Sequence, residues 1–221
     1  MTSRSPAELE DKLDQALAWR KIELSALEAE VRRLARSSPD APLTRALTRS
    51  GVALAYAHWE GYLKEICQHY LDYVSVRRLR YSELSDSLAL TALQDLLGKV
   101  GAGDEAATLA LLEIVRTPDT ARARIPRRNV VQSKSNLRYQ VLVEIFARLG
   151  LPVQFFETKE NFIDKSLCDA RNEVAHGRDH YPDPTGFGNT VEDVVVMLDH
   201  ARDLVVEHVR TTGYRHKPTE P

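Results

Sequence analysis

The sequence predicts an all-α protein: a helical bundle with two long helices at its N-terminus and a helix pair at its C-terminus. Apolar residues recur at helical spacing along most of the 221 residues, and no convincing segment alternates apolar and polar residues as a half-buried strand does. With 43% hydrophobic and 28% charged residues, the chain can bury a sizeable core. We therefore expect one helical domain over residues 1–212 and a flexible tail over 213–221.

Two long helices are expected first. Leucine and valine residues recur at roughly helical spacing between residues 7 and 36. The run Ser37–Pro42 contains two prolines and interrupts this pattern. A second helix is predicted from about residue 43 to residue 78, with Tyr56 and Trp59 in the core. The two helices would form an antiparallel hairpin, as in helical bundles.

The middle of the chain is predicted to contain shorter helices. Two are expected over residues 85–99 and 104–115, where glycines punctuate the pattern. Ser133 or Ser135 would cap a third, which ends before Gly150. These helices would extend the bundle without adding a sheet.

Between the second and third of these short helices lies a basic, irregular segment over about residues 116–134. Asp119 is its only acidic residue, against Arg116, Arg122, Arg124, Arg127, Arg128 and Lys134. Such a segment can attract phosphate groups locally although the net charge of the chain is −2. The alternative is a solvated loop that keeps the protein soluble.

The C-terminal helix pair closes the predicted fold. Its first helix would begin between residues 161 and 166 and end at Gly177, a residue typical of the position after a helix. Its second helix would begin at Thr190 and run to about Arg210. Asp193, three positions after Thr190, suggests a capping box there.

The composition also indicates a compartment. No apolar run approaches roughly 18 residues, so no membrane span is expected. The charged N-terminus lacks the apolar core of a signal peptide. Cys67 and Cys168 lie far apart within helical patterns, which favours buried free thiols over a disulfide framework. We expect a cytoplasmic protein.

The stretch from residue 171 to residue 177, RNEVAHG, is the most suggestive of chemistry. Arginine can hold a phosphate with its planar fork of donors, and histidine exchanges protons near neutral pH. On a helix, Arg171 would lie at the edge of the apolar stripe, while Asn172 and His176 would share one face. Spacing alone is weak evidence, because similar pairs occur at Arg202 with His208 and at Arg210 with His216.

At these residues the chain resembles the HEPN superfamily, the helical domains of many prokaryotic toxin and defence ribonucleases. Their signature is an arginine, often followed by a polar residue, and then a histidine after a short spacer; here four residues separate Arg171 from His176. Residues 56–65, YAHWEGYLKE, are similar to an early helix of the RiboL-PSP type of HEPN domain. Residues 135–152 are similar to the middle of that type. The resemblance spans most of residues 1–212 and implies an HEPN-like fold.

The resemblance implies a metal-independent endoribonuclease of a toxin–antitoxin or antiphage defence system, without a cofactor. His176 would act as general base or acid when the RNA 2′-hydroxyl attacks its own phosphate. Arg171 would stabilise the phosphorane that forms, and Asn172 would orient His176 or bind a phosphate oxygen. The basic segment offers further candidate contacts to RNA phosphates at Arg124, Arg127 and Arg128.

The resemblance also implies partners. One motif supplies one histidine, whereas the reaction gains from an acid and a base together. We therefore expect a homodimer that brings two motifs into one cleft. A toxic ribonuclease also needs control, which suggests an antitoxin or another neutralising protein.

A supporting role is open for Glu60 in the second helix. It is a candidate partner that orients the Arg171 guanidinium; the alternative is an exposed ion pair between Glu60 and Lys64, one turn away. The neighbouring Gly61 lowers helix propensity, and such a glycine often permits the close approach of another backbone.

Two functional alternatives are also open. The first is a non-catalytic HEPN module that acts in protein assembly or regulation, with Arg171 as a structural residue. The second is a metal site formed by His176, Asp179, His180 and Asp183. Gly177 argues against the metal site, because a helix that ends there cannot hold the two histidines one turn apart. Nothing in the chain resembles a Ser-His-Asp triad, a P-loop or a dinucleotide-binding glycine motif.

Overall fold

The computed structural model describes residues 3–126, 130–133, 135–178 and 182–217. Throughout these residues the regular structure is helical, which confirms the all-α prediction. Two isolated β-bridges, Arg80 with Arg122 and Leu84 with Arg215, do not extend into strands. None of the helices in this part of the chain combines the length and the apolarity needed to cross a bilayer.

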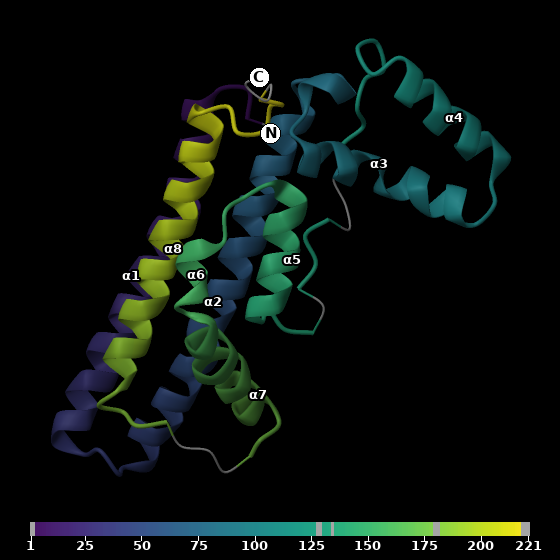
Figure 1. Cartoon of the computed structure of the whole chain (residues 1–221). Coiled ribbons are helices and arrows are strands. Elements are labelled where there is room, and N and C mark those ends of the chain that lie inside the picture. Colours follow the sequence, from purple (N-terminus) through teal and green to yellow (C-terminus); the bar gives the residue numbers. More distant parts are fainter. Residues whose placement is uncertain (1–2, 127–129, 134, 179–181, 218–221) are drawn as a thin grey trace.

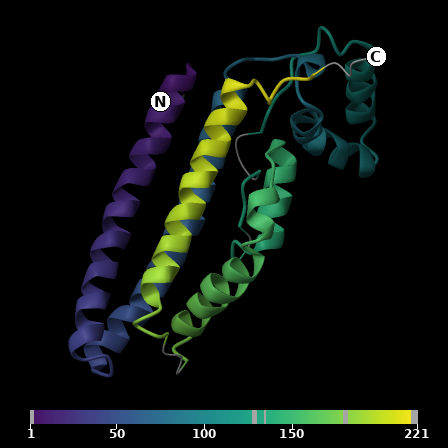
Figure 2. The same cartoon turned by 60° about the vertical axis from the view of Figure 1, so that its left-hand side comes forward.

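Three long helices form the body of the molecule. They are α1 (Pro6–Ser37), α2 (Pro42–Ser75) and α8 (Phe187–Arg210). Each packs against the other two, and they lie side by side in both views (Figure 1, Figure 2). The predicted hairpin of α1 and α2 is present, and α8 completes the bundle beside it.

Shorter elements cover one side of this bundle. They are η1 (Tyr81–Glu83), α3 (Asp86–Gly101), α4 (Glu105–Arg116), α5 (Tyr139–Leu149), α6 (Gln154–Glu157), the π-helical segment η2 (Phe162–Asp169) and α7 (Ala170–Ala175). The α3–α4 hairpin projects from one end of the long helices, whereas α7 finishes near the other end (Figure 1). Both η2 and α7 pack against α2.

Large aromatic side chains fill the space between α2 and the elements around it. Trp59, Tyr62 and Tyr70 of α2 are fully buried, as are Phe146 of α5 and Phe156 of α6. Tyr56 is only 2% exposed, so the prediction that Tyr56 and Trp59 belong to the core is confirmed. Both cysteines are buried free thiols, and burial raises the pKa of each to about 12.

The start of α5 differs from the prediction. The helix begins at Tyr139 with Arg138 as its N-cap, several residues after the expected caps. Ser133 is instead buried and donates a hydrogen bond to the carboxylate of Glu60 on α2. A local capping pattern was therefore overridden by a tertiary contact.

The start of α8 also differs. The helix begins at Phe187 after Gly186, three residues before Thr190. Asp193 does not cap it; its carboxylate accepts a hydrogen bond from the Lys159 ammonium group at 2.7 Å. The burial of Phe187, which is 2% exposed, explains why the first turn forms earlier.

Within the described part of the chain, the close backbone approach expected at Gly61 is absent, and the tight contact of α2 is instead at Gly51, against a side chain. A Cβ placed on Gly61 would lie 3.7 Å from a guanidinium nitrogen of Arg20, an ordinary contact. A Cβ placed on Gly51 would lie 2.5 Å from the ring of Phe187, closer than carbon atoms approach. Because Gly51 has no side chain, Phe187 in the first turn of α8 can pack closely against α2 at this position.

The chain after α8 remains packed on the bundle beyond residue 213, where the flexible tail was expected to begin. Tyr214 is 5% exposed, and its carbonyl accepts a hydrogen bond from the Ser85 amide at 3.0 Å. The His216 amide donates to the Glu83 carbonyl at 3.0 Å. Of the expected tail, residues 218–221 lie outside the described residues.

Candidate functional site

The arginine–histidine motif lies where α7 ends. Gly177 has a φ of +67°, and its amide donates to the Val174 carbonyl at 3.1 Å. The Arg178 amide donates to the Glu173 carbonyl at 3.0 Å. These two bonds form a Schellman motif, which needs a left-handed residue such as glycine at the position of Gly177. The prediction that the helix ends here is confirmed: Ala175 is its last residue and His176 is its C-cap.

A π-helical segment directly precedes α7. The hydrogen bonds of such a segment span one residue more than those of an α-helix, and π-helical turns are frequent at functional sites. Two carboxylates of η2 attach it to the start of α5. The Tyr139 amide donates to Asp164 at 2.8 Å, and Arg138 forms an ion pair with Asp169 at 2.6 Å. The residues that lead into the motif are therefore fixed to the bundle on both sides.

Arg171 is half-buried and is surrounded by neutral groups. Its Nη1 atom donates to Asn136 Oδ1 at 3.1 Å and to Asn172 Oδ1 at 2.9 Å. Its guanidinium lies over the Tyr56 ring, 4.9 Å from the ring centroid. Among the described residues, no carboxylate lies within ion-pairing distance of Arg171. Its charge is thus held in one orientation without being neutralised.

The supports of Arg171 are themselves anchored. The hydroxyl of Tyr56 accepts a hydrogen bond from the Leu137 amide at 2.9 Å. The Leu137 carbonyl accepts from the Trp59 indole and from the Cys168 thiol, each at 3.5 Å. The segment that carries Asn136 is therefore held between α2 and η2, which places its amide oxygen on Arg171.

Asn136 is a site residue that the sequence did not single out. It lies in the stretch 135–152, which resembles the family, but no local pattern relates it to a residue 35 positions away. Besides that resemblance, the sequence offers only its position in a segment rich in polar residues, just before α5.

Glu60 does not contact Arg171 directly, so the expected orienting contact is absent. Its Oε1 atom accepts from the Lys64 ammonium group at 2.7 Å and from the Ser133 hydroxyl. The alternative Glu60–Lys64 pair is therefore present, although the Glu60 side chain is only 16% exposed. Burial disfavours the charged form, but hydrogen bonds from Lys64, Ser133 and Tyr56 outweigh it and lower the pKa of Glu60. Glu60 and Arg171 thus share Tyr56 as a common neighbour.

His176 is exposed at the end of α7. Its backbone amide donates to the Asn172 carbonyl at 2.9 Å, while no described residue forms a hydrogen bond or ion pair with its imidazole. Asn172 in turn accepts from Arg171. The three motif residues therefore form one connected unit, with the imidazole free to meet a ligand.

Within one chain, Arg124 of the basic segment lies far from this unit, whereas Ser133 near the other end of the segment contacts Glu60. Arg124 is exposed and lies beside the end of α2, where the Ala123 amide donates to the Leu79 carbonyl at 3.0 Å. From Tyr56 to Ser75, α2 alone spans roughly 28 Å at about 1.5 Å per residue. Of the other candidate phosphate contacts, Arg127 and Arg128 lie outside the described residues.

The proposed metal ligands are only partly described. Among the described residues, no group of three histidine, cysteine, aspartate or glutamate side chains is placed to hold a metal ion. Asp179 and His180 lie outside those residues. The helix that carries the motif ends at Ala175, with His176 as its C-cap, so α7 does not continue from His176 toward the rest of the proposed metal site.

The comparison with known protein families identifies one match. The family model described as RiboL-PSP-HEPN matches residues 15–210. This range contains most of α1, all of α2 and α8, and the whole arginine–histidine motif. No curated protein and no solved structure matches the chain.

Proposed function

The chain belongs to the RiboL-PSP-HEPN family, and we propose that it is a metal-independent endoribonuclease that acts through Arg171, Asn172 and His176. One observation carries the proposal: Arg171 is half-buried, oriented by neutral groups and close in sequence to an exposed histidine. A buried charge without a partner is unfavourable, so such a site favours an incoming anion. The phosphodiester of RNA supplies that anion.

In the proposed reaction the RNA 2′-oxygen forms a bond to the neighbouring phosphorus while the bond from phosphorus to the 5′-oxygen breaks. A proton leaves the 2′-hydroxyl, and another reaches the departing 5′-oxygen. His176 performs one of these transfers. Arg171 binds the extra negative charge of the phosphorane, and Asn172 holds both Arg171 and the backbone of His176.

A homodimer would supply the second proton-transfer group. Residues five positions apart on an α-helix are separated by roughly 140° around the axis, so Arg171 and His176 of one chain leave α7 on different sides. Arg171 lies against Tyr56, whereas His176 is exposed. A second copy whose α7 meets the first across a two-fold axis would bring two histidines and two arginines into one cleft.

The proposed setting is a toxin–antitoxin or antiphage defence system, and it rests on family resemblance. His176 is exposed, so RNA would have open access to it. The ribonuclease would then need a neutralising protein to keep it inactive. Such a protein would inhibit most directly by covering the end of α7.

Expression of wild type beside His176→Ala and Arg171→Ala tests the ribonuclease proposal. We expect growth arrest and fragmented RNA with wild type only. For purified protein in excess chelator, His176→Ala should lower the cleavage rate at least about 100-fold, the usual contribution of a general acid or base. His216→Ala is the matched control, because His216 belongs to an arginine–histidine pair of similar spacing and is also exposed. Cleavage at the wild-type rate by folded His176→Ala protein would refute the proposal.

The second candidate is a non-catalytic assembly module. It is favoured by the contacts of Arg171 with Asn136, Asn172 and Tyr56, which a purely structural arginine would also make. In that case wild-type protein would leave RNA intact. Arg171→Ala would lower the melting temperature, and His176→Ala would change neither stability nor association.

A further inference from the structure

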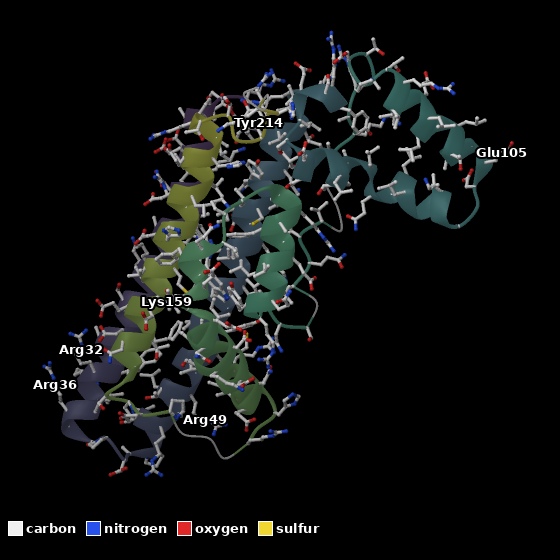
Figure 3. The ribbon with its side chains drawn as sticks, in the orientation of Figure 1. Arg32, Arg36, Arg49, Glu105, Lys159 and Tyr214 are labelled. Atoms are coloured by element: carbon white, nitrogen blue, oxygen red, sulfur yellow. The ribbon has the colours of Figure 1, made fainter. Side chains whose placement is uncertain are left out.

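A second group of arginines lies next to the motif, at the end of the bundle where α7 finishes. Arg45 and Arg49 of α2 and Arg178, which follows Gly177, line a pocket of about 480 Å³. We call it the arginine pocket. Figure 3 shows Arg49 at this end of the molecule, far from Glu105 on the projecting hairpin. Gly177 also lines the pocket, so its wall begins one residue after His176.

The pocket joins segments that are distant in sequence. Arg49 Nη1 donates to the Arg178 carbonyl at 2.9 Å, across 129 positions of the chain. This bond attaches the segment after the motif to α2. The Schellman bonds at the end of α7 fix the same segment from the other side. The location of the pocket relative to His176 is therefore defined by the fold.

The charge of the pocket is positive. Among the described residues that line it, three carry a guanidinium group and one, Asp40, carries a carboxylate. Asp40 pairs with Arg45 at 3.0 Å, and Glu173 pairs with Arg178 at 2.7 Å. Both arginine side chains are substantially exposed, at 45% and 65%. Exposed ion pairs of this kind are weak, so a phosphate can compete for these guanidinium groups.

We propose that the arginine pocket binds a backbone phosphate of the RNA strand, adjacent to the phosphate that is cleaved. The proposal rests on the proposed function, because it takes His176 as the place of cleavage. A strand whose reacting phosphate lies at His176 passes Gly177 and meets the pocket next. Arginine suits this role, since its planar fork matches two phosphate oxygens. The pocket supplies the local positive charge that Arg124 cannot supply from the far end of α2.

RNA binding tests the pocket separately from cleavage. The probe is a fluorescein-labelled single-stranded RNA of about 20 nucleotides, and the readout is fluorescence anisotropy over a range of salt concentrations. All proteins are full chains that carry His176→Ala, so the probe stays intact. In this background we compare Arg45→Gln with Arg49→Gln, alone and together. The control is the double variant Arg210→Gln and Arg215→Gln. These two arginines are also exposed and ion-paired, and they lie at the opposite end near Tyr214.

We expect the pocket double variant to bind RNA about ten-fold more weakly near 0.1 M salt. The slope of log K against log salt should also become shallower by about 0.7, the contribution of one phosphate of a single strand. The control pair should keep the parent slope. Arg45→Gln leaves the bond between Arg49 and Arg178 intact, so a weaker but definite effect of this single variant excludes a simple loss of folding.

Two results would overturn the proposal: unchanged affinity and slope in the pocket variants, or no RNA binding by the parent protein. Cleavage by wild-type protein is measured in parallel. If binding depends on the pocket but wild type does not cleave, the pocket stands and the ribonuclease proposal fails. If wild type cleaves RNA but the pocket variants bind RNA as tightly as the parent protein, the ribonuclease proposal stands and the pocket proposal fails.

Discussion

The site depends on how a few side chains surround one arginine. Asn136, Asn172 and Tyr56 hold Arg171 through neutral oxygens and an aromatic face. A carboxylate in any of these places would orient the guanidinium equally well but would also neutralise it. Neutral supports therefore keep the arginine both rigid and available to an anion, which is what phosphate stabilisation requires.

Replacing one neutral support by a charged one tests this interpretation. In Asn136→Asp, a carboxylate would stand about where the amide oxygen now lies 3.1 Å from Arg171 Nη1. We expect RNA cleavage to fall at least about ten-fold while the melting temperature stays level or rises, because the new ion pair competes with phosphate. Asn136→Ala, which removes the acceptor without adding charge, should lose less activity. Equal activity of Asn136→Asp and wild type would show that the charge of Arg171 is not used.

Glu60 gives a prediction for pH dependence. Its pKa in the folded protein is lowered from 4.5, so its charged form stabilises the fold above that value. This contribution is lost as pH falls through the lowered pKa. Glu60→Gln should therefore destabilise the protein by about 1.5 kcal/mol at neutral pH, the scale of hydrogen bonds to a charged group. The difference from wild type should shrink below about pH 4.5.

Urea denaturation of both proteins between about pH 3 and pH 7 measures the difference between their free energies of unfolding. The matched control is Glu105→Gln, an exposed carboxylate on the projecting hairpin. If the free energies of unfolding of wild type and Glu60→Gln differ by the same amount throughout this pH range, the charged form of Glu60 does not stabilise the fold.

At the scale of elements, two local departures from regular helix position the site. The π-helical segment η2 leads into α7 and is tied to α5 through Asp164 and Asp169. The glycine at position 51 lets the first turn of α8 approach α2. Each would be unfavourable in an isolated helix, and each is stabilised by packing against a neighbouring element.

Two glycines of α2 form a matched pair for testing this packing. Gly51→Ala should lower the free energy of unfolding by about 1–3 kcal/mol, because its methyl group overlaps the ring of Phe187. Gly61→Ala should instead be neutral or stabilising by up to about 1 kcal/mol, since alanine favours the helix and the site has room. Chemical denaturation of both variants measures these changes in the free energy of unfolding. A stable Gly51→Ala protein would mean that α2 and α8 can separate there without penalty.

At the scale of the whole molecule, the two ends of the bundle differ. One end bears the α3–α4 hairpin, with exposed apolar side chains such as Leu90, Leu109 and Val115. The other end bears the α7 terminus and the arginine pocket. The candidate chemistry therefore lies at one end of an elongated bundle (Figure 2), where a second copy can meet it.

The proposed composite site predicts complementation between inactive chains. Arg171→Ala and His176→Ala proteins should each be inactive alone. Mixed under conditions that allow exchange of subunits, they should recover part of the wild-type cleavage rate, because one shared cleft then holds an intact arginine and an intact histidine. Light scattering should report twice the mass of one chain. A monomeric mass with full wild-type activity would exclude the composite site.

The sequence by itself determined the helical class, the long N-terminal hairpin and the motif from Arg171 to His176. These features follow from local rules: the periodicity of apolar residues, the breaks at proline and glycine, and the end of a helix at Gly177. Each of these rules relates residues within a turn or two, so a single sequence is enough to apply them.

Only the tertiary structure decided which groups surround the motif. Asn136 reaches Arg171 from 35 positions away, and Arg49 reaches Arg178 from 129. The same packing moved the start of α5 to Tyr139 and assigned Glu60 to Lys64 and Ser133. The physical reason is that a helix pattern specifies which face is buried, whereas the partners of that face depend on how distant helices pack together.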